Sequence, residues 1–421
     1  MMKLKKAYNL TKFYWLKGGE YMNILLINDL IECGGAEVHV RYEYKILQQH
    51  RHNVYMLTFD EIDKYNNFKK EYINLINIHI NNKNIIIKVV NKFFINFVLY
   101  LKIRKIIKQI NPDLIHCHNM NLAPFTQILA LRGYKVIQTL HDYSVVCPKG
   151  NCIYKKNACS GYKKSCFKCL YEDKGVILKK IRLIILNKIR KIRVNKFISP
   201  SKKLCEYAKT YNLDCITINN PVEDIELNYD ENLLKEKFNK KIYLYFGQIN
   251  ENKGIFEVLD EIIDFVNKNE DVMFYIVGNA ENYYKNLLLK KIQNIERVKY
   301  FGKLAHKDVI ELLKQIYCVI VPSLWMENYP TTVIEAMQNM CLVIGSDRGG
   351  IPEIIGSQEF IFNVMNKFEF SNLLNKINDL DFKNFKLQLT LNRDRINKNN
   401  NTNKYYDDII NLDSASNAER H

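Results

Sequence analysis

Two glutamates in the last third of the chain have a spacing that suits the binding of an anion with hydroxyl groups at both ends. Glu327 and Glu335 lie on either side of the segment Pro-Thr-Thr at 330–332. The preceding run CVIVPS predicts a buried strand, and Thr331 or Thr332 would cap the helix that follows it. Backbone N–H groups around residues 328–332 would then face an anion, which the helix dipole favours. A nucleotide-sugar has the required shape, because carboxylates accept hydrogen bonds from sugar hydroxyls, although two ordinary surface glutamates would show the same spacing.

The elements that must position these residues alternate between strand and helix in both halves of the chain. At 421 residues the chain is longer than a single core usually allows, so two domains are expected. Short apolar runs predict strands at 23–28, 53–59, 114–118, 135–141 and 196–200, and again at 242–249, 272–279, 298–302, 318–323 and 342–347. Helix-period stretches such as 254–268 and 307–316 lie between them. We predict an α/β fold of two Rossmann-like domains that face each other across a cleft, over residues 22–198 and 199–385, with a polar helical tail over 386–421.

The charge of the chain favours anionic partners. The sequence has 62 Lys and Arg against 45 Asp and Glu, a formal net charge of +17. Two basic and apolar stretches, 83–108 and 174–196, contain no acidic residue and have the isoleucine spacing of amphipathic helices. Such helices lie on anionic membranes, but they also pack an apolar face on a sheet and solvate their lysines. A nucleic-acid site is not predicted, because the basic stretches lack regularly spaced aromatic residues.

The cysteines and the N-terminus suggest a cytoplasmic protein. Eleven cysteines without a secretory signal are typical of a reducing compartment. Residues 1–21 lack the apolar core of a signal peptide, and we interpret them as either a non-native leader or a flexible arm. Five cysteines crowd an insert at 147–169, and four of them could hold a structural zinc ion: Cys147, Cys152, Cys166 and Cys169. Reduced thiols are the alternative.

Several motifs, in order along the chain, resemble those of the retaining glycosyltransferases of family four, which have the GT-B fold. The run SLWMENYPTTVIEAM (323–337), continued by LVIGSDRGGIPEII (342–355), resembles their donor-binding signature. YFGQINENKG (245–254) is similar to the first strand and loop of their second domain, and GGAE (34–37) to the glycine-rich loop of the first. LHDY (140–143) resembles the segment that places a histidine beside the reacting carbon. The resemblance extends from about Met22 to Ile355.

The resemblance implies a role for each matching residue. Glu327 would bind hydroxyls of the transferred sugar, Glu335 the ribose, and Lys253 the diphosphate, whose negative charge it would neutralise. His141 would face the anomeric carbon. The remaining donor-binding residues implied are Gly34, Gly35, Gln248, Gly278, Leu304, Asn328, Tyr329, Thr331 and Thr332.

Two observations qualify this assignment. The family usually has arginine where this chain has Gln248, so one positive charge is missing unless another base such as Arg348 replaces it. His116 and His118 lie two residues apart on one face of a predicted strand, where they would pack in the core or line the cleft, with a metal pair as the alternative.

The function predicted from the sequence is transfer of a sugar from a nucleotide-diphospho-sugar to a saccharide or lipid-linked saccharide. No cofactor is expected for catalysis, since the family transfers sugars without a metal ion. The basic first half suggests work at the inner face of the cell membrane, in surface-polysaccharide synthesis. A sugar-nucleotide epimerase and a basic nucleic-acid-binding protein are the alternatives. A dinucleotide-dependent oxidoreductase is disfavoured, because ECGGAE (32–37) lacks the glycine fingerprint.

Overall fold

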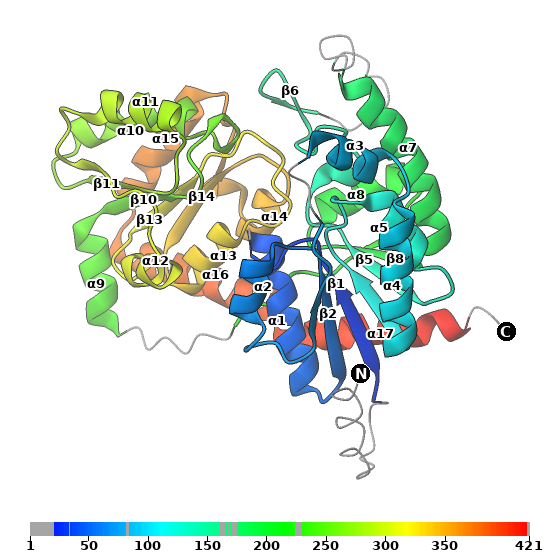
Figure 1. Cartoon of the computed structure of the whole chain (residues 1–421). Helices are drawn as coiled ribbons and strands as arrows, with labels where there is room; N and C mark the ends of the chain where they lie inside the picture. The colour runs from blue at the N-terminus through cyan, green and yellow to red at the C-terminus, as the bar shows by residue number, and fades with distance from the viewer. Residues whose placement is uncertain are drawn as a thin grey trace.

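The computed structural model contains two parallel sheets, each covered by helices (Figure 1). It describes residues 21–32, 34–80, 84–159, 166, 169, 175–223 and 230–418, so the predicted leader at 1–21 lies almost entirely outside the described residues. The first sheet has seven strands in the order β3-β2-β1-β4-β5-β8-β9, and the second has six in the order β12-β11-β10-β13-β14-β15. The α/β class with two Rossmann-like halves is therefore confirmed.

The first sheet is built from short, almost wholly buried strands. Its strands are β1 (Asn23–Ile27), β2 (Asn53–Thr58), β3 (Leu75–Asn77), β4 (Leu114–Cys117), β5 (Val136–Thr139), β8 (Lys196–Ser199) and β9 (Cys215–Thr217). The helices around it are α1 (Gly35–Gln49), α2 (Ile62–Phe68), α3 (Ile85–Phe93), α4 (Phe97–Ile110), α5 (Pro124–Ala130), α7 (Gly175–Arg193) and α8 (Lys202–Thr210). Continuous apolar runs such as NILLI in β1 are expected here, because a parallel sheet is covered on both faces.

The second sheet carries the strands that lead into the donor-type motifs. Its strands are β10 (Ile242–Phe246), β11 (Met273–Val277), β12 (Val298–Tyr300), β13 (Cys318–Val321), β14 (Leu342–Ser346) and β15 (Ile361–Phe362). Its helices are α9 (Glu231–Lys240), α10 (Ile255–Lys268), α11 (Asn282–Ile292), α12 (His306–Leu313), α13 (Thr331–Gln338), α14 (Ile351–Ile355), α15 (Lys367–Asn378) and α16 (Phe382–Asn399). In α10 the buried residues recur every three or four positions, which gives the helix one apolar face for the sheet.

The boundary predicted after residue 198 falls too early. Strand β9 pairs in parallel with β8, and α8 lies between them in the chain, so the first sheet continues to Thr217. Sequence reasoning missed β9 because its three residues are too few to show a period. The C-terminal helix α17 (Thr402–Ala418) also returns to the first unit and packs on α1 (Figure 1).

The cysteine-rich insert begins after β5 and holds a small hairpin, β6 (Ile153–Tyr154) and β7 (Asn157–Ala158). The hairpin reaches the second unit through Lys156. The Lys156 Nζ lies 2.7 Å from a Glu257 carboxylate oxygen, and Arg348 donates a hydrogen bond to the Lys156 carbonyl at 3.4 Å. The insert therefore bridges the two units rather than extending from the first alone.

Candidate functional site

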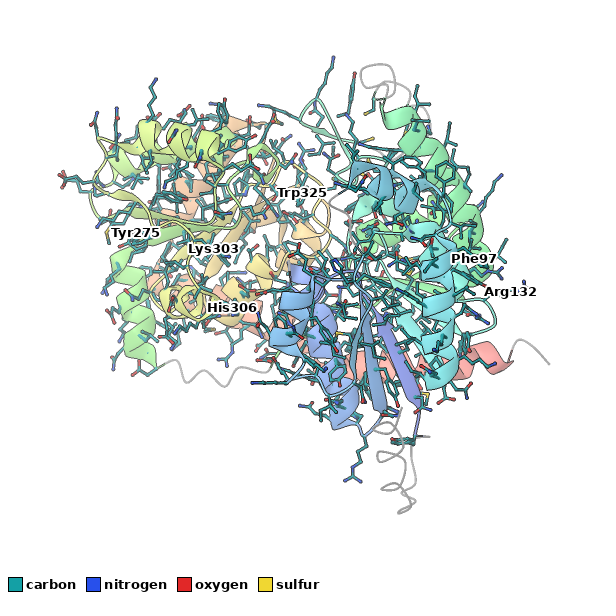
Figure 2. The ribbon with its side chains drawn as sticks, viewed as in Figure 1. Phe97, Arg132, Tyr275, Lys303, His306 and Trp325 are labelled. Carbon is teal, nitrogen blue, oxygen red and sulfur yellow. The ribbon has the colours of Figure 1, made fainter. Side chains whose placement is uncertain are left out.

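A pocket of about 250 Å³ lies between the two units and contains most of the predicted site residues. The first unit contributes residues at the start of α1 and after β5, and the second contributes the loop between β13 and α13 together with Lys253. Trp325, labelled in Figure 2, lies on the part of the second unit that faces the first. The lining residues are Gly35, Ala36, His141, Asn220, Lys253, Trp325, Glu327, Asn328, Tyr329, Pro330, Thr331 and Thr332.

Lys253 and Glu327 form an ion pair at the wall of this pocket. The Lys253 Nζ lies 2.7 Å from Glu327 Oε1 and 4.6 Å from the centre of the Trp325 ring. The Ser323 hydroxyl donates a second hydrogen bond to the same carboxylate oxygen at 2.7 Å. Burial raises the pKa of Glu327, but the charge of Lys253 and the hydrogen bonds from Lys253 and Ser323 outweigh it and lower the pKa below its ordinary value. Glu327 is therefore a fixed acceptor of hydrogen bonds at neutral pH.

Two helix N-termini face each other across the pocket. A Cβ on Gly35, the first residue of α1, would lie 3.6 Å from Thr331 Cγ2, at the first residue of α13. Neither predicted threonine caps α13: the N-cap residue is Pro330, whose extended backbone sets the entry of the chain, and no side chain caps the helix. That prediction was wrong, and its consequence is that the first N–H groups of α13 have no capping side chain. Two helix dipoles and Lys253 together favour a multiply charged anion.

The loop that carries Glu327 is held against a pair of glycines. Gly349 has φ +59°, and a Cβ there would lie 1.8 Å from the Glu327 carbonyl oxygen. Gly350 N donates a hydrogen bond to that carbonyl at 2.8 Å. Only glycine allows this approach, so the Gly-Gly pair positions the Glu327 backbone.

Asn328 joins the two units. Its side-chain amide donates to the Leu140 carbonyl at 2.8 Å and accepts from the Ser201 hydroxyl at 2.6 Å, and both partners belong to the first unit. Asn328 is buried. The residue was predicted to bind donor, and it lines the pocket, but its side-chain hydrogen bonds link the two units.

His141 lies between the pocket and a buried network of histidines. His118 Nδ1 is 3.0 Å from His141 Nε2, and His116 Nδ1 is 2.6 Å from Glu43 Oε1. Burial, followed by the nearby His116, lowers the pKa of His118 to about 3, and burial holds the pKa of His141 well below its ordinary value. The prediction that His116 and His118 pack in the core is confirmed, since both side chains are buried.

Five predicted residues do not line the pocket. Gln248 is exposed, and its side chain accepts from Asn250 at 3.5 Å. Gly34 is the N-cap of α1, one residue before the pocket, and Leu304 packs against the second core. Glu335 lies one turn into α13, and one of its carboxylate oxygens is 3.6 Å from His306 Nε2.

Gly278 has a structural explanation that does not involve a ligand. A Cβ at this position would lie 1.7 Å from the Gly247 carbonyl oxygen, so glycine is needed where the ends of β10 and β11 approach.

Arg348 does not replace the missing arginine. Its Nε lies 3.2 Å from Asp347 Oδ1, and its other contact is with the insert hairpin. Among the described residues that line the pocket, Lys253 is therefore the only lysine or arginine. Sequence reasoning missed Trp325 and Ser323, although both lie within four residues of Glu327, because only the folded loop shows that they contact Lys253 and the carboxylate.

In the described part of the cysteine insert, no group of possible metal ligands converges around a cysteine. A hydrogen bond from Cys152 lowers the pKa of Cys147 to about 6. Within the described residues, two groups of possible metal ligands converge to within 4.8 Å, one of His39, His118 and His141 and one of Glu43, His116 and His118, and neither includes a cysteine. The zinc site at Cys147, Cys152, Cys166 and Cys169 stays a prediction without support from the described side chains.

The two basic stretches form an exposed apolar surface on the first unit. Six apolar side chains of α7 are between 45% and 74% exposed: Ile177, Leu178, Ile181, Ile184, Ile185 and Ile192. Arg182 of α7 lies 5.5 Å from the ring of Phe93 in α3, so the two helices are neighbours. Phe97, labelled in Figure 2 and two-thirds exposed, lies on the side of the first unit away from the second. Over the described residues, every helix is too short or too polar to cross a membrane.

Comparison with known families matches both units. Residues 33–224 match the family described as Glycosyltransferase Family 4, and residues 229–396 match Glycosyl transferases group 1. An uncharacterized 42.6 kDa protein in the cps region of Klebsiella pneumoniae is 23% identical over 350 residues, which are 79% of this chain and 87% of that protein. Spore coat protein SA of Bacillus subtilis is 28% identical over 28% of this chain and 33% of its own length.

Solved structures share the fold at low sequence identity. HepE of Anabaena in complex with UDP-glucose has a TM-score of 0.69 at 16% identity, over 94% of this chain and 100% of that one. TarM of S. aureus, in a complex with Fondaparinux, α-GlcNAc-glycerol and UDP, has a TM-score of 0.66 at 12% identity, over 93% and 99% of the two chains.

Proposed function

The chain belongs to glycosyltransferase family 4, a retaining family with the GT-B fold that uses nucleotide-sugar donors, and on this premise we propose that it transfers a sugar from a UDP-sugar to a lipid-linked saccharide. The choice of uridine is supported by the UDP bound in the related structures of HepE and TarM. The choice of acceptor is supported by the exposed basic helices and by the relative from a cps region.

The observation that carries this proposal is the pocket between the two units. It combines two helix N-termini and Lys253 for a diphosphate with a buried, ionised Glu327 for sugar hydroxyls. In the proposed reaction, the α13 N-terminus and Lys253 stabilise the charge that develops on the departing diphosphate. Glu327 holds hydroxyls of the transferred sugar, and His141, on the opposite wall, lies beside the anomeric carbon. The acceptor hydroxyl then attacks from the face that the diphosphate leaves.

Lys253 has to change partners when the donor binds. In the present arrangement it pairs with Glu327 at 2.7 Å, and a diphosphate would compete for the same ammonium group. At about 250 Å³ the pocket is smaller than the roughly 300–1,000 Å³ typical of ligand sites. We therefore expect the cleft to open for donor entry and to close again before transfer.

The acceptor side of the proposal places α3 and α7 on an anionic membrane surface. Partial burial and the charges of Arg182 and Lys179 lower the pKa of Lys92, so cations from both helices gather on one face. Apolar side chains interleaved with lysines and arginines suit the boundary between acyl chains and acidic headgroups. A lipid-linked saccharide would reach the cleft from that surface.

Thermal denaturation with UDP-, GDP- and ADP-sugars tests the donor site. We expect one UDP-sugar to stabilise the protein, because a ligand that binds the folded state raises the melting temperature. Lys253→Ala and Glu327→Ala should each abolish the stabilisation, whereas Lys299→Ala and Glu296→Ala, at exposed positions outside the pocket, should preserve it. Stabilisation that persists in the pocket variants would contradict the proposed site.

The products separate transfer from the alternatives. A transferase releases UDP only when acceptor is present, whereas an epimerase converts one UDP-sugar into another without acceptor. Salt-sensitive binding of oligonucleotides in place of any nucleotide-sugar would favour the nucleic-acid alternative.

A further inference from the structure

Three histidines beneath the pocket have the arrangement of ligands around one metal ion. The ring centres of His39, His118 and His141 are 5.5, 5.2 and 5.2 Å apart, and one ring nitrogen of each lies within 4.8 Å of the others. Three imidazoles on a tetrahedral ion, with metal–nitrogen bonds of about 2.0 Å, would place their ring centres about 5.2 Å apart. The three rings come from α1, from the loop after β4 and from the loop after β5.

The hydrogen bonds around Tyr405 leave one nitrogen of His39 ready for a metal. The Tyr405 hydroxyl donates a hydrogen bond to Glu43 Oε2 at 3.0 Å, so it accepts a hydrogen bond from His39 Nε2 at 3.1 Å. In the tautomer that this hydrogen bond selects, the proton of His39 is on Nε2 and Nδ1 carries a lone pair. This Nδ1 is buried and has no hydrogen-bond partner.

The charge of Glu43 favours a proton on Nε2 of the second ligand, His118. As an ionised carboxylate it only accepts hydrogen bonds, and His118 Nε2 lies 3.2 Å from its Oε2, although not aligned for a hydrogen bond. A proton on Nε2 leaves a lone pair on His118 Nδ1, which faces His141 Nε2 at 3.0 Å. Two ligand nitrogens on one tetrahedral ion would be about 3.3 Å apart.

We propose that His39 Nδ1, His118 Nδ1 and His141 Nε2 form a site for a divalent transition-metal ion such as Zn²⁺. Glu43 and Tyr405 would serve as the outer partners that orient the ligating rings. When the ion binds, the proton of His141 moves from Nε2 to Nδ1, so no net proton is released. The fourth position of a tetrahedral ion would face the pocket and hold water.

The neighbouring group of Glu43, His116 and His118 is a weaker candidate. Both nitrogens of His116 already have partners, Nδ1 with Glu43 and Nε2 with the Thr139 hydroxyl at 2.7 Å. An ion there would have to break these bonds. The site that includes His141 instead borders the pocket, which gives an ion a route of entry.

The proposed ion inhibits rather than catalyses, and this consequence depends on the proposed transferase function. A metal on His141 Nε2 removes the freedom of that ring beside the reacting sugar. Three imidazole ligands favour zinc, copper or nickel over magnesium, which prefers oxygen. Zn²⁺ should therefore inhibit transfer, and Mg²⁺ should not.

Binding is measured first, without donor or acceptor, so that its result does not depend on any activity. The whole protein is titrated with Zn²⁺ by calorimetry and with Co²⁺ by absorption spectroscopy. We expect one ion per chain, and the Co²⁺ spectrum should lack the thiolate charge-transfer band that a site in the cysteine insert would give. His39→Gln should weaken binding at least 100-fold, and Tyr405→Phe, which keeps all three ligands, about tenfold. His79→Gln, an exposed histidine outside the cluster, is the matched control.

Inhibition is measured second, in the transfer assay. Zn²⁺ should stop transfer by the wild type and chelation should restore it, whereas His39→Gln should remain active in Zn²⁺. A melting curve of each metal-free variant shows whether it folds. Equal Zn²⁺ binding by wild type and His39→Gln, no binding by the wild type, or binding with a thiolate band would each overturn the proposed site. Binding as expected with no effect on transfer would overturn only its inhibitory role.

Discussion

The Ser323 hydroxyl helps to stabilise the ionised form of the Glu327 carboxylate. Ser323 donates to the same oxygen as Lys253, and its loss would leave that oxygen with one partner fewer. We expect Ser323→Ala to weaken donor binding about tenfold, since a buried hydrogen bond to a charged group contributes roughly 1.5–3 kcal/mol. Calorimetric titration with the stabilising UDP-sugar measures this change, and unaltered affinity would show that Lys253 alone fixes the carboxylate.

The same substitution should move the acid limit of donor binding. In the wild type the pKa of Glu327 lies below its ordinary value, so the contribution of its carboxylate is complete at neutral pH and is lost as the pH falls through the lowered pKa. Without the Ser323 hydroxyl the pKa rises, because one lowering interaction is gone while burial remains. We expect the loss to begin at higher pH in Ser323→Ala, as measured by donor-induced stabilisation across an acid pH series.

At the scale of residues, the members of the site could be predicted from the sequence where a motif resembles one whose residues have known roles. Lys253, Glu327 and His141 were predicted and lie in one pocket, although their roles remain proposals. The link between Glu43 and His141 could not be predicted, because it runs through residues from three separate segments. Gln248 shows the limit of carrying a family pattern over, since the side chain at that position lies outside the pocket.

At the scale of elements, the loop after β14 is as important as the loop that it supports. Gly349→Ala would place a methyl group 1.8 Å from the Glu327 carbonyl oxygen, and we expect it to lose donor binding and several kcal/mol of stability, on the order of other strained core changes. Gly302→Ala is the matched control, because its φ is +71° and nothing lies within 4 Å of its Cβ position. The control should cost only the left-handed backbone penalty, about 1 kcal/mol. Equal chemical denaturation of the two variants would refute the close-approach argument.

The exposed apolar face of α7 should bind membranes, and this can be tested without changing the donor site. Ile181→Asp with Ile185→Asp should abolish binding to vesicles that contain phosphatidylglycerol, because each buried isoleucine contributes roughly 1.5–3 kcal/mol and each added carboxylate is repelled. Both side chains are about half exposed, so folding should be little changed. Leu387→Asp, at a similarly exposed position on α16, is the control. Flotation with vesicles measures the difference. If the double variant still binds vesicles, the membrane contact is not on this face of α7.

Long periodic elements could be predicted from sequence, and short or junction-dependent features could not. The ten predicted strands are present, nine of them with four or more residues and β12 with three. Strands β3, β9 and β15 have only two or three residues and depend on neighbours for their pairing. The start of α13 differs from the prediction because Pro330 already holds the extended backbone that an N-cap requires.

For the whole molecule, Asn328 supplies two of the hydrogen bonds that join the two units. Asn328→Ala removes both hydrogen bonds to the first unit and leaves the Leu140 carbonyl without that partner, at a cost of about 1–3 kcal/mol to the closed arrangement. We expect kcat to fall more than donor affinity, and small-angle scattering to show a larger radius of gyration. Asn269→Ala, which removes the hydrogen bond from that side-chain amide to the Phe265 carbonyl within the second unit, should change neither.

The division into two halves could be predicted from the repeated pattern, but the path of the C-terminus could not. The polar composition of the tail suggested helices on the outside, and α17 is indeed helical, yet Tyr405 and Ile409 are buried in the core of the first unit beside Ile24 and Leu26. The surface that such a helix covers cannot be predicted from its sequence, because only two apolar residues among its described side chains, Tyr405 and Ile409, are buried against the rest of the protein.

This return of α17 has a consequence during synthesis on the ribosome. The last strand of the first sheet ends at Thr217, but the core beneath that sheet includes Tyr405, which is synthesised 188 residues later. At about 5–20 residues per second, the nascent chain would carry an unfinished first domain for roughly 10 to 40 s. The apolar side chains of α1 and β1 that pack with Tyr405 and Ile409 would stay exposed in that interval, so the core of the first half is completed only after the second half has been synthesised.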